Sequence, residues 1–277
     1  MPATCTTDRA PTDRPDDRGR DQIRVLYVLP ADADDDHLDT SGRLCSSVRA
    51  FASWFHAQSG AYLRLDTAGG AIDLGFVRLA QTDAVLRGDD PANGSVEHGI
   101  AFVRERIERE LAAAGLLAPD KLYAVYYGGT SAYSCGGGAW PPRVRGHLGA
   151  FYLEAAPYAG LPRCSDGPWG AADLVPAYAD YAMLHELMHT LGIVSDAAPH
   201  QQAMGHVFDE GAAQPQRDLM YTPRPGLTDP PWGASLPGGL VLDLGHDDYA
   251  GSGLPVDVAT SSFVAPLTPG AHRPPGW

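Results

Sequence analysis

The sequence lacks long apolar runs and is poor in basic residues. No stretch approaches the roughly 18 apolar residues that a membrane-spanning helix needs, so we expect a soluble globular chain with no membrane partner. The 20 Lys and Arg residues stand against 34 Asp and Glu, which gives a formal net charge of −14. Nucleic acids and anionic membranes select basic surfaces. We therefore expect neither nucleic acid nor membrane as a partner.

Two common catalytic signatures are also missing. The sequence has no GxSxG motif and no GxxxxGK[ST] motif, which argues against an α/β serine hydrolase and a P-loop NTPase. Glycine and proline are abundant instead, at 32 and 24 of the 277 residues. This composition predicts a loop-rich protein of the kind that disulfides or metals often stabilise.

The four cysteines form no CxxC pair, which argues against a zinc ribbon. Cys135 and Cys164 lie in the loop-like segments SCGGG and PRCSD, on either side of one predicted strand. We expect a disulfide between these two. Cys45 falls in a helix-like run and is expected to be buried, whereas Cys5 lies in the N-terminal tail.

The N-terminal residues 1–22 are polar and have no apolar core of the kind that a signal peptide requires. We expect a disordered tail there, followed by one catalytic domain over residues 23–277. The acidic composition and the expected disulfide favour a secreted, extracellular protein, although no signal peptide is visible in this sequence. A monomer is expected.

Hydrophobic periodicity predicts α/β material followed by a long irregular segment. The upper part of the domain is expected over 23–192, and a loop-rich lower part over 193–277 with one short helix near 247–250. The predicted strands are 23–30, 62–67, 73–80, 121–129 and 148–156, and the predicted helices are 43–58, 95–115 and 171–192.

The segment YAMLHELMHTLG contains His185 and His189, four residues apart, with Glu186 directly after the first histidine. Positions i and i+4 lie on one helix face, so both imidazoles can bind one tetrahedral zinc ion. Glu186 can then take a proton from a water molecule that the metal has made acidic. The flanking residues are apolar and predict a buried helix, in which unpartnered polar groups would be costly. The alternative is a core helix whose histidines bond neighbouring carbonyls.

With Gly192 three residues after His189, the motif reads H-E-x-x-H-x-x-G and resembles that of the metzincin metallopeptidases. The blocks CGGGAWPP, GHVFD, DLMY and LDLGHDDY resemble actinobacterial secreted proteins of metzincin type, over most of residues 23–249. The resemblance implies an α/β (α+β) fold with a twisted mixed sheet, an active-site helix and a loop-rich C-terminal subdomain. It also implies a zinc-dependent endopeptidase acting on a protein or peptide substrate.

The third zinc ligand does not follow the metzincin pattern. In that family it lies three residues after the glycine, where this chain has Ser195, a poor zinc ligand. Asp196, His200 and His206 are the remaining candidates. Because neutral imidazole suits zinc, we favour the histidines, with His206 ahead of His200 and Asp196 third.

Two neighbouring features support His206. Asp209 and Glu210 follow it and are expected to supply a carboxylate that orients it. It is also close in sequence to Met220, which the resemblance makes the apolar floor beneath the metal. The resemblance further gives Tyr221 a catalytic role as a donor to the oxyanion, although metzincins place this tyrosine two residues after the methionine and here it is adjacent.

We expect an extended substrate to pair with LGAFYLEAA (148–156), interpreted as an edge strand. Trp140 in CGGGAWPP, interpreted as a rigid surface loop, is expected to wall the substrate cleft. Two other interpretations stay open. One is a gluzincin-type metallopeptidase that uses Glu210 as its third ligand. The other is a secreted zinc-containing binding or structural module without turnover.

Calcium is a possible second cofactor. The acidic segments ADADDDHLD (31–39) and LDLGHDDYAGSG (242–253) offer clustered carboxylates, which calcium prefers. The first lacks a regular ligand spacing, so a solvated acidic loop is favoured there. The second is equally compatible with an aspartate-rich helix N-terminus, or with a carboxylate that orients a zinc ligand.

Overall fold

Five strands form one central sheet in a computed structural model that describes residues 2–17, 19–88, 100–131, 134–156, 163–170, 174–224, 227–235 and 239–277. The strand order is β5-β1-β6-β8-β7. Neighbours run parallel except β7, which is antiparallel to β8. This mixed and mostly parallel sheet agrees with the predicted α/β class. The bounds are β1 Gln22–Leu29, β5 Leu74–Arg78, β6 Lys121–Tyr127, β7 Gly136–Trp140 and β8 Val144–Tyr152.

The central strands β1 and β6 are buried along their whole length, as expected for parallel strands covered on both faces. The strands predicted at 23–30, 73–80 and 121–129 are confirmed. The strand predicted at 62–67 is reduced to β2 (Tyr62–Leu63), which pairs with β11 (Val264–Ala265) outside the central sheet. The short strands β3 (Thr67–Ala68) and β4 (Ala71–Ile72) pair with each other.

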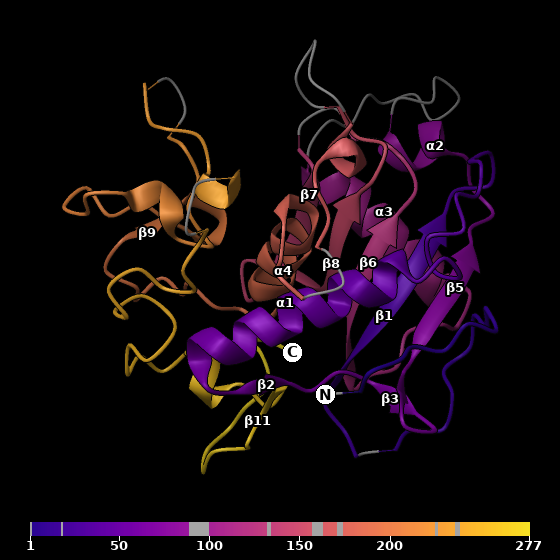
Figure 1. The fold of residues 1–277 in the computed structure, drawn as a ribbon, viewed down its shortest axis with the longest axis horizontal. Helices are drawn as coiled ribbons and strands as arrows, with labels where there is room; N and C mark the ends of the chain where they lie inside the picture. Colours follow the sequence, from indigo (N-terminus) through magenta and orange to yellow (C-terminus); the bar gives the residue numbers. More distant parts are fainter. Residues whose placement is uncertain are drawn as a thin grey trace.

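Helices lie on both sides of the sheet. Figure 1 shows α1 (Arg43–Ser59) and α4 (Tyr178–Thr190) on one side and α3 (Ile100–Ala113) behind it. On α3, the apolar residues Val103, Ile107 and Leu111 lie at helical spacing and are buried. The predicted residues 95–99 and 171–173 lie outside the described residues. A short helix, α2 (Asp83–Arg87), was not predicted.

The edge of the sheet differs from the sequence prediction. Residues 148–156 were expected to form an edge strand, but β8 lies between β6 and β7. The edge on this side of the sheet is β7, within the CGGGAWPP segment that was expected to be a surface loop, and β5 forms the opposite edge. The prediction was wrong because glycine carries no hydrophobic signal, and a strand made of Gly-Gly-Gly-Ala-Trp shows no alternation.

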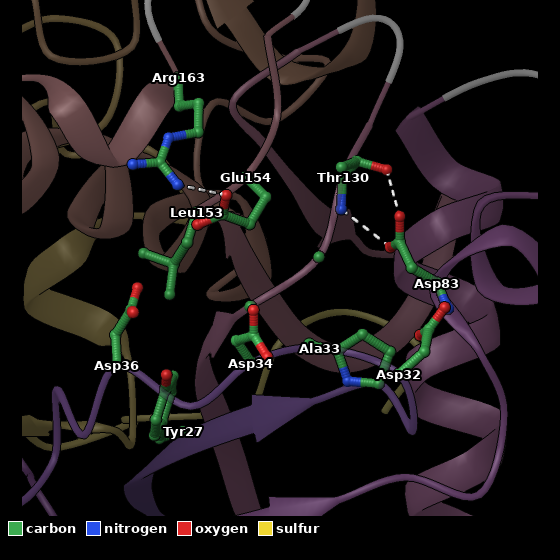
Figure 2. Close-up of a pocket in the computed structure, with 13 residues that line it drawn as sticks. Tyr27, Asp32, Ala33, Asp34, Asp36, Asp83, Thr130, Leu153, Glu154 and Arg163 are labelled. Atoms are coloured by element: carbon green, nitrogen blue, oxygen red, sulfur yellow. Dashed lines mark hydrogen bonds and ion pairs between the residues drawn. The ribbon is translucent and has the colours of Figure 1, made fainter.

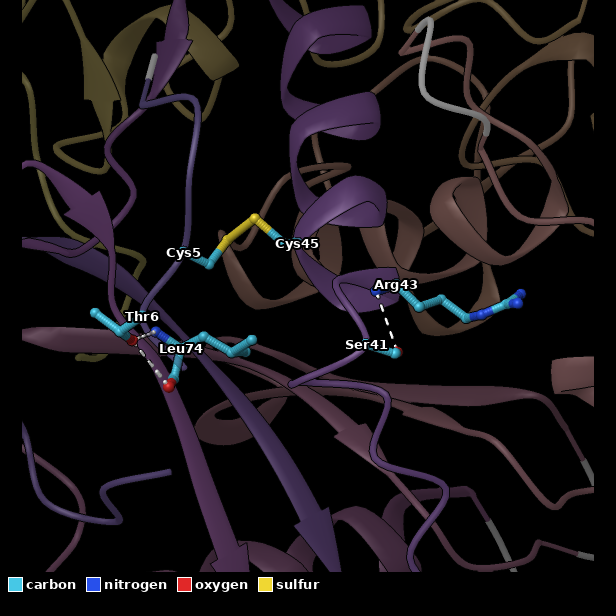
Figure 3. The surroundings of a disulfide bond; sticks show 6 residues. All are labelled: Cys5, Thr6, Ser41, Arg43, Cys45 and Leu74. Atoms are coloured by element: carbon cyan, nitrogen blue, oxygen red, sulfur yellow. Dashed lines mark hydrogen bonds between the residues drawn. A yellow bond between two sulfur atoms is a disulfide. The ribbon is translucent and has the colours of Figure 1, made fainter. Parts of the chain in front are cut away.

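The N-terminal segment is ordered against the sheet, in contrast to the disordered tail that was predicted. Cys5 forms a disulfide with Cys45 on α1, across 40 residues of sequence (Figure 3). The next residue, Thr6, exchanges hydrogen bonds with the backbone of Leu74 at the start of β5. This polar segment is therefore held by a disulfide and by hydrogen bonds to β5. Neither contact can be predicted from the composition of the segment.

An ion cluster also holds the N-terminal segment. The Lys121 ammonium lies 2.6 Å from a carboxylate oxygen of Asp13, 2.7 Å from Asp16 and 2.6 Å from Asp66. Lys121 and Asp66 are buried, with side chains 3% and 1% exposed. Burial raises the pKa of Asp66 and Lys121 opposes that effect. The lysine thus neutralises acidic groups from two segments of the chain.

The predicted disulfide between Cys135 and Cys164 is confirmed. It joins the start of β7 to a short helical turn after β8. Two disulfides fit an extracellular protein. None of the helices in the described part of the chain combines the length and the apolar character that crossing a membrane requires.

In its described residues, the segment after α4 contains only short elements. The hairpin of β9 (Gln201–Gln202) and β10 (His206–Val207) is the main regular feature. The short helix predicted at 247–250 is absent: this stretch is a loop, and the buried Asp243 accepts the backbone N–H groups of Tyr249 and Ala250. Short 3-10 helices are η2 Cys164–Asp166, η3 Ala203–Gly205, η4 Pro215–Arg217, η5 Gly233–Ser235 and η6 Val258–Thr260.

We predict that Lys121→Met lowers the free energy of unfolding by about 3 kcal/mol, because it leaves the buried Asp66 without its cation. Urea denaturation with the disulfides intact measures the change. Adding Asp66→Asn to this variant should recover part of the loss, since the buried charge is then removed.

The matched control is Arg143→Met. Arg143 and Asp196 also form an ion pair, at 2.8 Å, but their side chains are 62% and 55% exposed. An exposed pair contributes less than about 1 kcal/mol. Equal losses in the two variants would contradict the importance of the Lys121 cluster.

Candidate metal centre

Three histidines from two segments meet at one point. His185 and His189 come from adjacent turns of α4, and His206 begins β10. The Nε2 atom of His189 lies 3.1 Å from Nε2 of His185 and 3.3 Å from Nε2 of His206. These three side chains form a group whose ligand atoms all lie within 4.8 Å of one another. The structure thus brings the two motif histidines together with the favoured third candidate.

The outer ring nitrogens fix where the protons sit. Nδ1 of His185 lies 2.7 Å from the carbonyl oxygen of Leu219, and Nδ1 of His206 lies 3.0 Å from that of Ala203. Because a carbonyl only accepts hydrogen bonds, both Nδ1 atoms carry the proton and donate it. In the neutral rings, both Nε2 atoms then present bare lone pairs to His189. At most one proton is available among three converging nitrogens, so a cation fits this arrangement better than hydrogen bonds do.

The imidazoles are kept neutral by their surroundings. Burial, together with the neighbouring His206, lowers the pKa of His185 to about 3. Burial and the two neighbouring histidines hold the pKa of His189 well below its usual value, and burial lowers that of His206. Metal ligation requires the neutral ring, and the three side chains meet that requirement at neutral pH without losing a proton.

Glu186 lies beside this group, between α4 and the edge strand. Its carboxylate faces Gly136 of β7, so closely that a Cβ atom on that glycine would overlap it. Burial raises the pKa of Glu186 to about 8, and a divalent cation at the three imidazoles would lower it. The glutamate is half-buried, and a Cβ atom on Gly138 would lie near both its Oε2 atom and Cβ of His189, at 3.4 and 2.7 Å.

The turn at Asp218–Tyr221 sets the orientation of His185. Asp218 is buried, and its carboxylate accepts hydrogen bonds from the backbone of Met220 and Leu244 and from the Tyr249 hydroxyl, at 2.7, 2.7 and 2.8 Å. Burial raises the pKa of Asp218 to about 8 and these three donors oppose the shift. The turn so fixed aims the Leu219 carbonyl at His185.

Sequence reasoning missed this support. The DLMY segment contains Asp218, but no role was predicted for this residue. Leu219 acts through its backbone carbonyl, which a pattern of side chains cannot indicate. Trp232 was also missed: its ring lies 5.6 Å from that of His185, and its indole N–H donates to the Asp218 carbonyl. The available signal was a tryptophan in a proline-rich loop downstream of the motif.

Met220 and Tyr221 have different surroundings from each other. Met220 is fully buried, and its carbonyl accepts the N–H of Val207, the residue after His206. This contact places the methionine turn next to the strand of the third histidine. The Tyr221 hydroxyl donates to the Pro230 carbonyl at 2.6 Å. The hydroxyl hydrogen of Tyr221 is therefore used in a hydrogen bond within the protein. In this arrangement it is not available to an oxyanion, contrary to the predicted catalytic role.

The other candidates for the third ligand lie elsewhere. Ser195 and Asp196 are outside the histidine group, and Asp196 pairs with Arg143 at the surface. Glu210 pairs with Arg224 and is 76% exposed. Neither Asp209 nor Glu210 orients His206, contrary to the prediction, because the Ala203 carbonyl occupies its Nδ1.

His200 belongs to a different cluster. Its backbone N–H and its Nδ1 bond the two oxygens of the buried Asp248, at 2.8 and 3.0 Å. Asp209 lies 3.8 Å from its Nε2, and Asp247 lies 3.9 Å from its Nδ1. Burial lowers the pKa of His200, but the hydrogen bond to Asp248 and the nearby carboxylates outweigh it and raise the pKa. Asp248, in the acidic segment 242–253, thus holds His200 and none of the three converging histidines.

Trp140 supports the hairpin from beneath. It is only 7% exposed, and its indole N–H donates to the Val194 carbonyl at 3.2 Å. A Cβ atom on Gly205 would lie within 2.7 Å of the indole ring, and Gly205 has a φ of +77°. The expectation that Trp140 walls a cleft therefore differs from the structure, in which it packs under the turn before His206.

The acidic loop 31–39 lies at a separate pocket. Figure 2 shows Asp32, Asp34 and Asp36 around this pocket at the carboxyl ends of β1, β6 and β8, together with the ion pair of Glu154 and Arg163. Exposed carboxylates alone do not specify an ion. The calcium site stays a prediction.

Comparisons with known proteins add no identification. No family model matches the sequence, and no curated protein matches it. Among solved structures, one described as the structure of a chaperone–substrate complex matches 64% of this chain and 24% of its own, at 16% identity and a TM-score of 0.28. This chain thus spans about a quarter of the length of that one, and a likeness at this level carries no argument.

We predict that His206→Ala weakens zinc binding by more than about 100-fold, whereas His200→Ala changes it by less than about tenfold. Loss of a direct ligand should exceed the 10- to 100-fold that changes around the ligands typically cost. Competition with a chromogenic chelator measures the affinity. If His206→Ala binds zinc as tightly as the unmodified chain, the assignment of the third histidine is wrong.

His200 should contribute stability that depends on pH. Because its pKa is raised in the folded state, the contribution is fully present below pH about 6.5 and is lost as the pH rises through the raised value. Thermal midpoints of the unmodified chain and of His200→Gln between pH 5 and 9 measure it. The gap between them should narrow with rising pH, and a gap that widens would contradict the ion pairing.

Proposed function

We propose that the protein is a zinc-dependent peptidase that cleaves internal peptide bonds. The observation that carries the proposal is the convergence of the Nε2 atoms of His185, His189 and His206, with Glu186 on the same helix as the first two. Three neutral imidazoles with one open position are the ligand set of a catalytic zinc rather than a closed structural site. The H-E-x-x-H-x-x-G resemblance to metzincins points in the same direction.

Each residue then has a distinct role. The three histidines would hold the ion, which supplies a Lewis acid that polarises a peptide carbonyl and acidifies water. Glu186 accepts a proton from the attacking water as the C–O bond forms. It then gives that proton to the departing amine as the C–N bond breaks, so the carboxylate is regenerated. The carbonyl of Leu219 keeps His185 in the tautomer that presents Nε2.

The substrate would lie along β7. This strand is the antiparallel edge of the sheet, and its residue Gly136 borders Glu186. An extended peptide that pairs with an edge strand gains backbone hydrogen bonds whatever its sequence. A peptide on this edge would place its carbonyl groups beside the glutamate, which favours an endopeptidase over an enzyme that needs a chain end.

We predict that Glu186→Gln lowers hydrolysis of fluorescein-labelled casein by at least about 100-fold while zinc content stays near one ion per chain. Glutamine fills the same space but cannot carry the proton. Chelation of the metal should abolish the activity of the unmodified chain, and added zinc should restore it.

Glu210→Gln is the matched control, because Glu210 lies at the surface on Arg224. It should keep both zinc and activity. If Glu210→Gln loses zinc, the gluzincin interpretation replaces the metzincin one. If zinc binds to the unmodified chain but neither casein nor a mixed peptide library is cleaved, a zinc-containing binding module is the better description.

A further inference from the structure

Three glycines lie on the face of the sheet that supports α4. Gly136 and Gly138 are alternate residues of β7, so they face the same side, and Gly149 of β8 pairs directly with Gly138. A Cβ atom on any of the three would come closer than 3 Å to α4. We call these three residues the glycine platform. They let the helix approach the backbone of the sheet without intervening side chains.

Two members of the platform face the helix backbone. A Cβ atom on Gly138 would lie 2.6 Å from the carbonyl oxygen of Glu186 and 2.7 Å from Cβ of His189. A Cβ atom on Gly149 would lie 2.7 Å from the same carbonyl oxygen. That carbonyl also accepts the Thr190 hydroxyl at 2.9 Å. The main chain of α4 cannot yield without moving the helix, so these two glycines set how close it lies.

Gly136 differs from the other two because the three atoms nearest to its Cβ position all belong to the side chain of Glu186. Its Cβ atom would lie 2.6 Å from both Cγ and Cδ of Glu186, and closer still to Oε1. The far end of a glutamate can move, whereas the backbone below it is fixed by the rest of the platform. A methyl group at this position would thus displace the carboxylate and leave the helix, His185 and His189 in place.

We infer that Gly136 is a positioning residue for Glu186: the bare backbone at this point of β7 fixes where the carboxylate lies beside the three histidines. The inference rests on the proposed function, since it gives the position of the proton acceptor. It also separates two roles within one run of glycines. Gly138 and Gly149 support the metal site as a whole, and Gly136 supports the glutamate alone.

The contact is tested first without any activity, by a double-mutant cycle on the thermal midpoint of the full chain. Gly136→Ala should lower the midpoint by about 2–6 °C in the unmodified background, because overpacking displaces the glutamate. The same change in a Glu186→Ala background should shift it by less than about 1 °C. Equal shifts in both backgrounds would overturn the inference, since the methyl group would then be displacing something else.

The second arm measures zinc and turnover. Gly136→Ala should bind zinc within about threefold of the unmodified affinity and should lower kcat by at least about tenfold, with little change in KM, on a quenched peptide derived from a casein cleavage site. A displacement of about 1 Å is enough to cost 100-fold in rate. Unchanged kcat would overturn the role of Gly136 in positioning Glu186 for turnover, even if the thermal coupling is as expected.

The controls separate this inference from the proposed function. Gly19→Ala places a methyl group where no atom lies within 4 Å and should change nothing. Gly138→Ala should lower the thermal midpoint in both Glu186 backgrounds and weaken zinc binding, because it meets main chain. If the zinc-loaded unmodified chain cleaves no peptide, the proposed function fails on its own. The thermal cycle still decides whether Gly136 fixes the position of Glu186.

Discussion

The convergence of three neutral imidazoles on one point is the constraint that the arrangement of the lower part of the chain has to meet. Two rings of α4 and one of β10 aim lone pairs at one another, an arrangement that costs free energy unless a cation occupies the point between them. Backbone hydrogen bonds and close packing hold the three rings in these positions. The Leu219 carbonyl fixes one ring and the Ala203 carbonyl fixes another, while the hairpin that carries His206 packs against Trp140.

In the lower part of the chain, buried aspartates accept hydrogen bonds from backbone N–H groups, as backbone carbonyls do in the helices and strands of the upper part. A loop segment leaves backbone N–H groups without partners, and these are costly when they are removed from water. Asp218, Asp243 and Asp248 each accept such groups while buried. Each carboxyl group accepts at least two hydrogen bonds, and these contacts hold the irregular segment in place around His185 and His200.

The parts of the fold that could be predicted are those with a local signal. The apolar runs of β1 and β6 and the helical spacing of α1 were enough to place these elements, and the H-E-x-x-H spacing placed two histidines on one helix face. The N-terminal segment was missed because its partners, Cys45 and Lys121, lie far away in sequence. The edge strand β7 was missed because its close packing against α4 requires glycine, and glycine hides the strand pattern. For His206 the sequence offered only an order of preference, since His200 has the same chemistry and only tertiary contacts with Asp248 separate them.

The glycine content of β7 has a consequence for chain entropy. Glycine loses more conformational freedom on folding than any other residue, so an edge strand that begins with three glycines is the segment of the sheet with most to gain from unfolding. Cys135 directly precedes that strand, and its disulfide to Cys164 closes a loop over a separation of 29 residues. A cross-link at this point reduces the conformational freedom of β7 in the unfolded state. The order of the sheet edge beside Glu186 is therefore tied to the oxidising conditions in which that bond persists, whereas the buried centre of the sheet is held by its own packing.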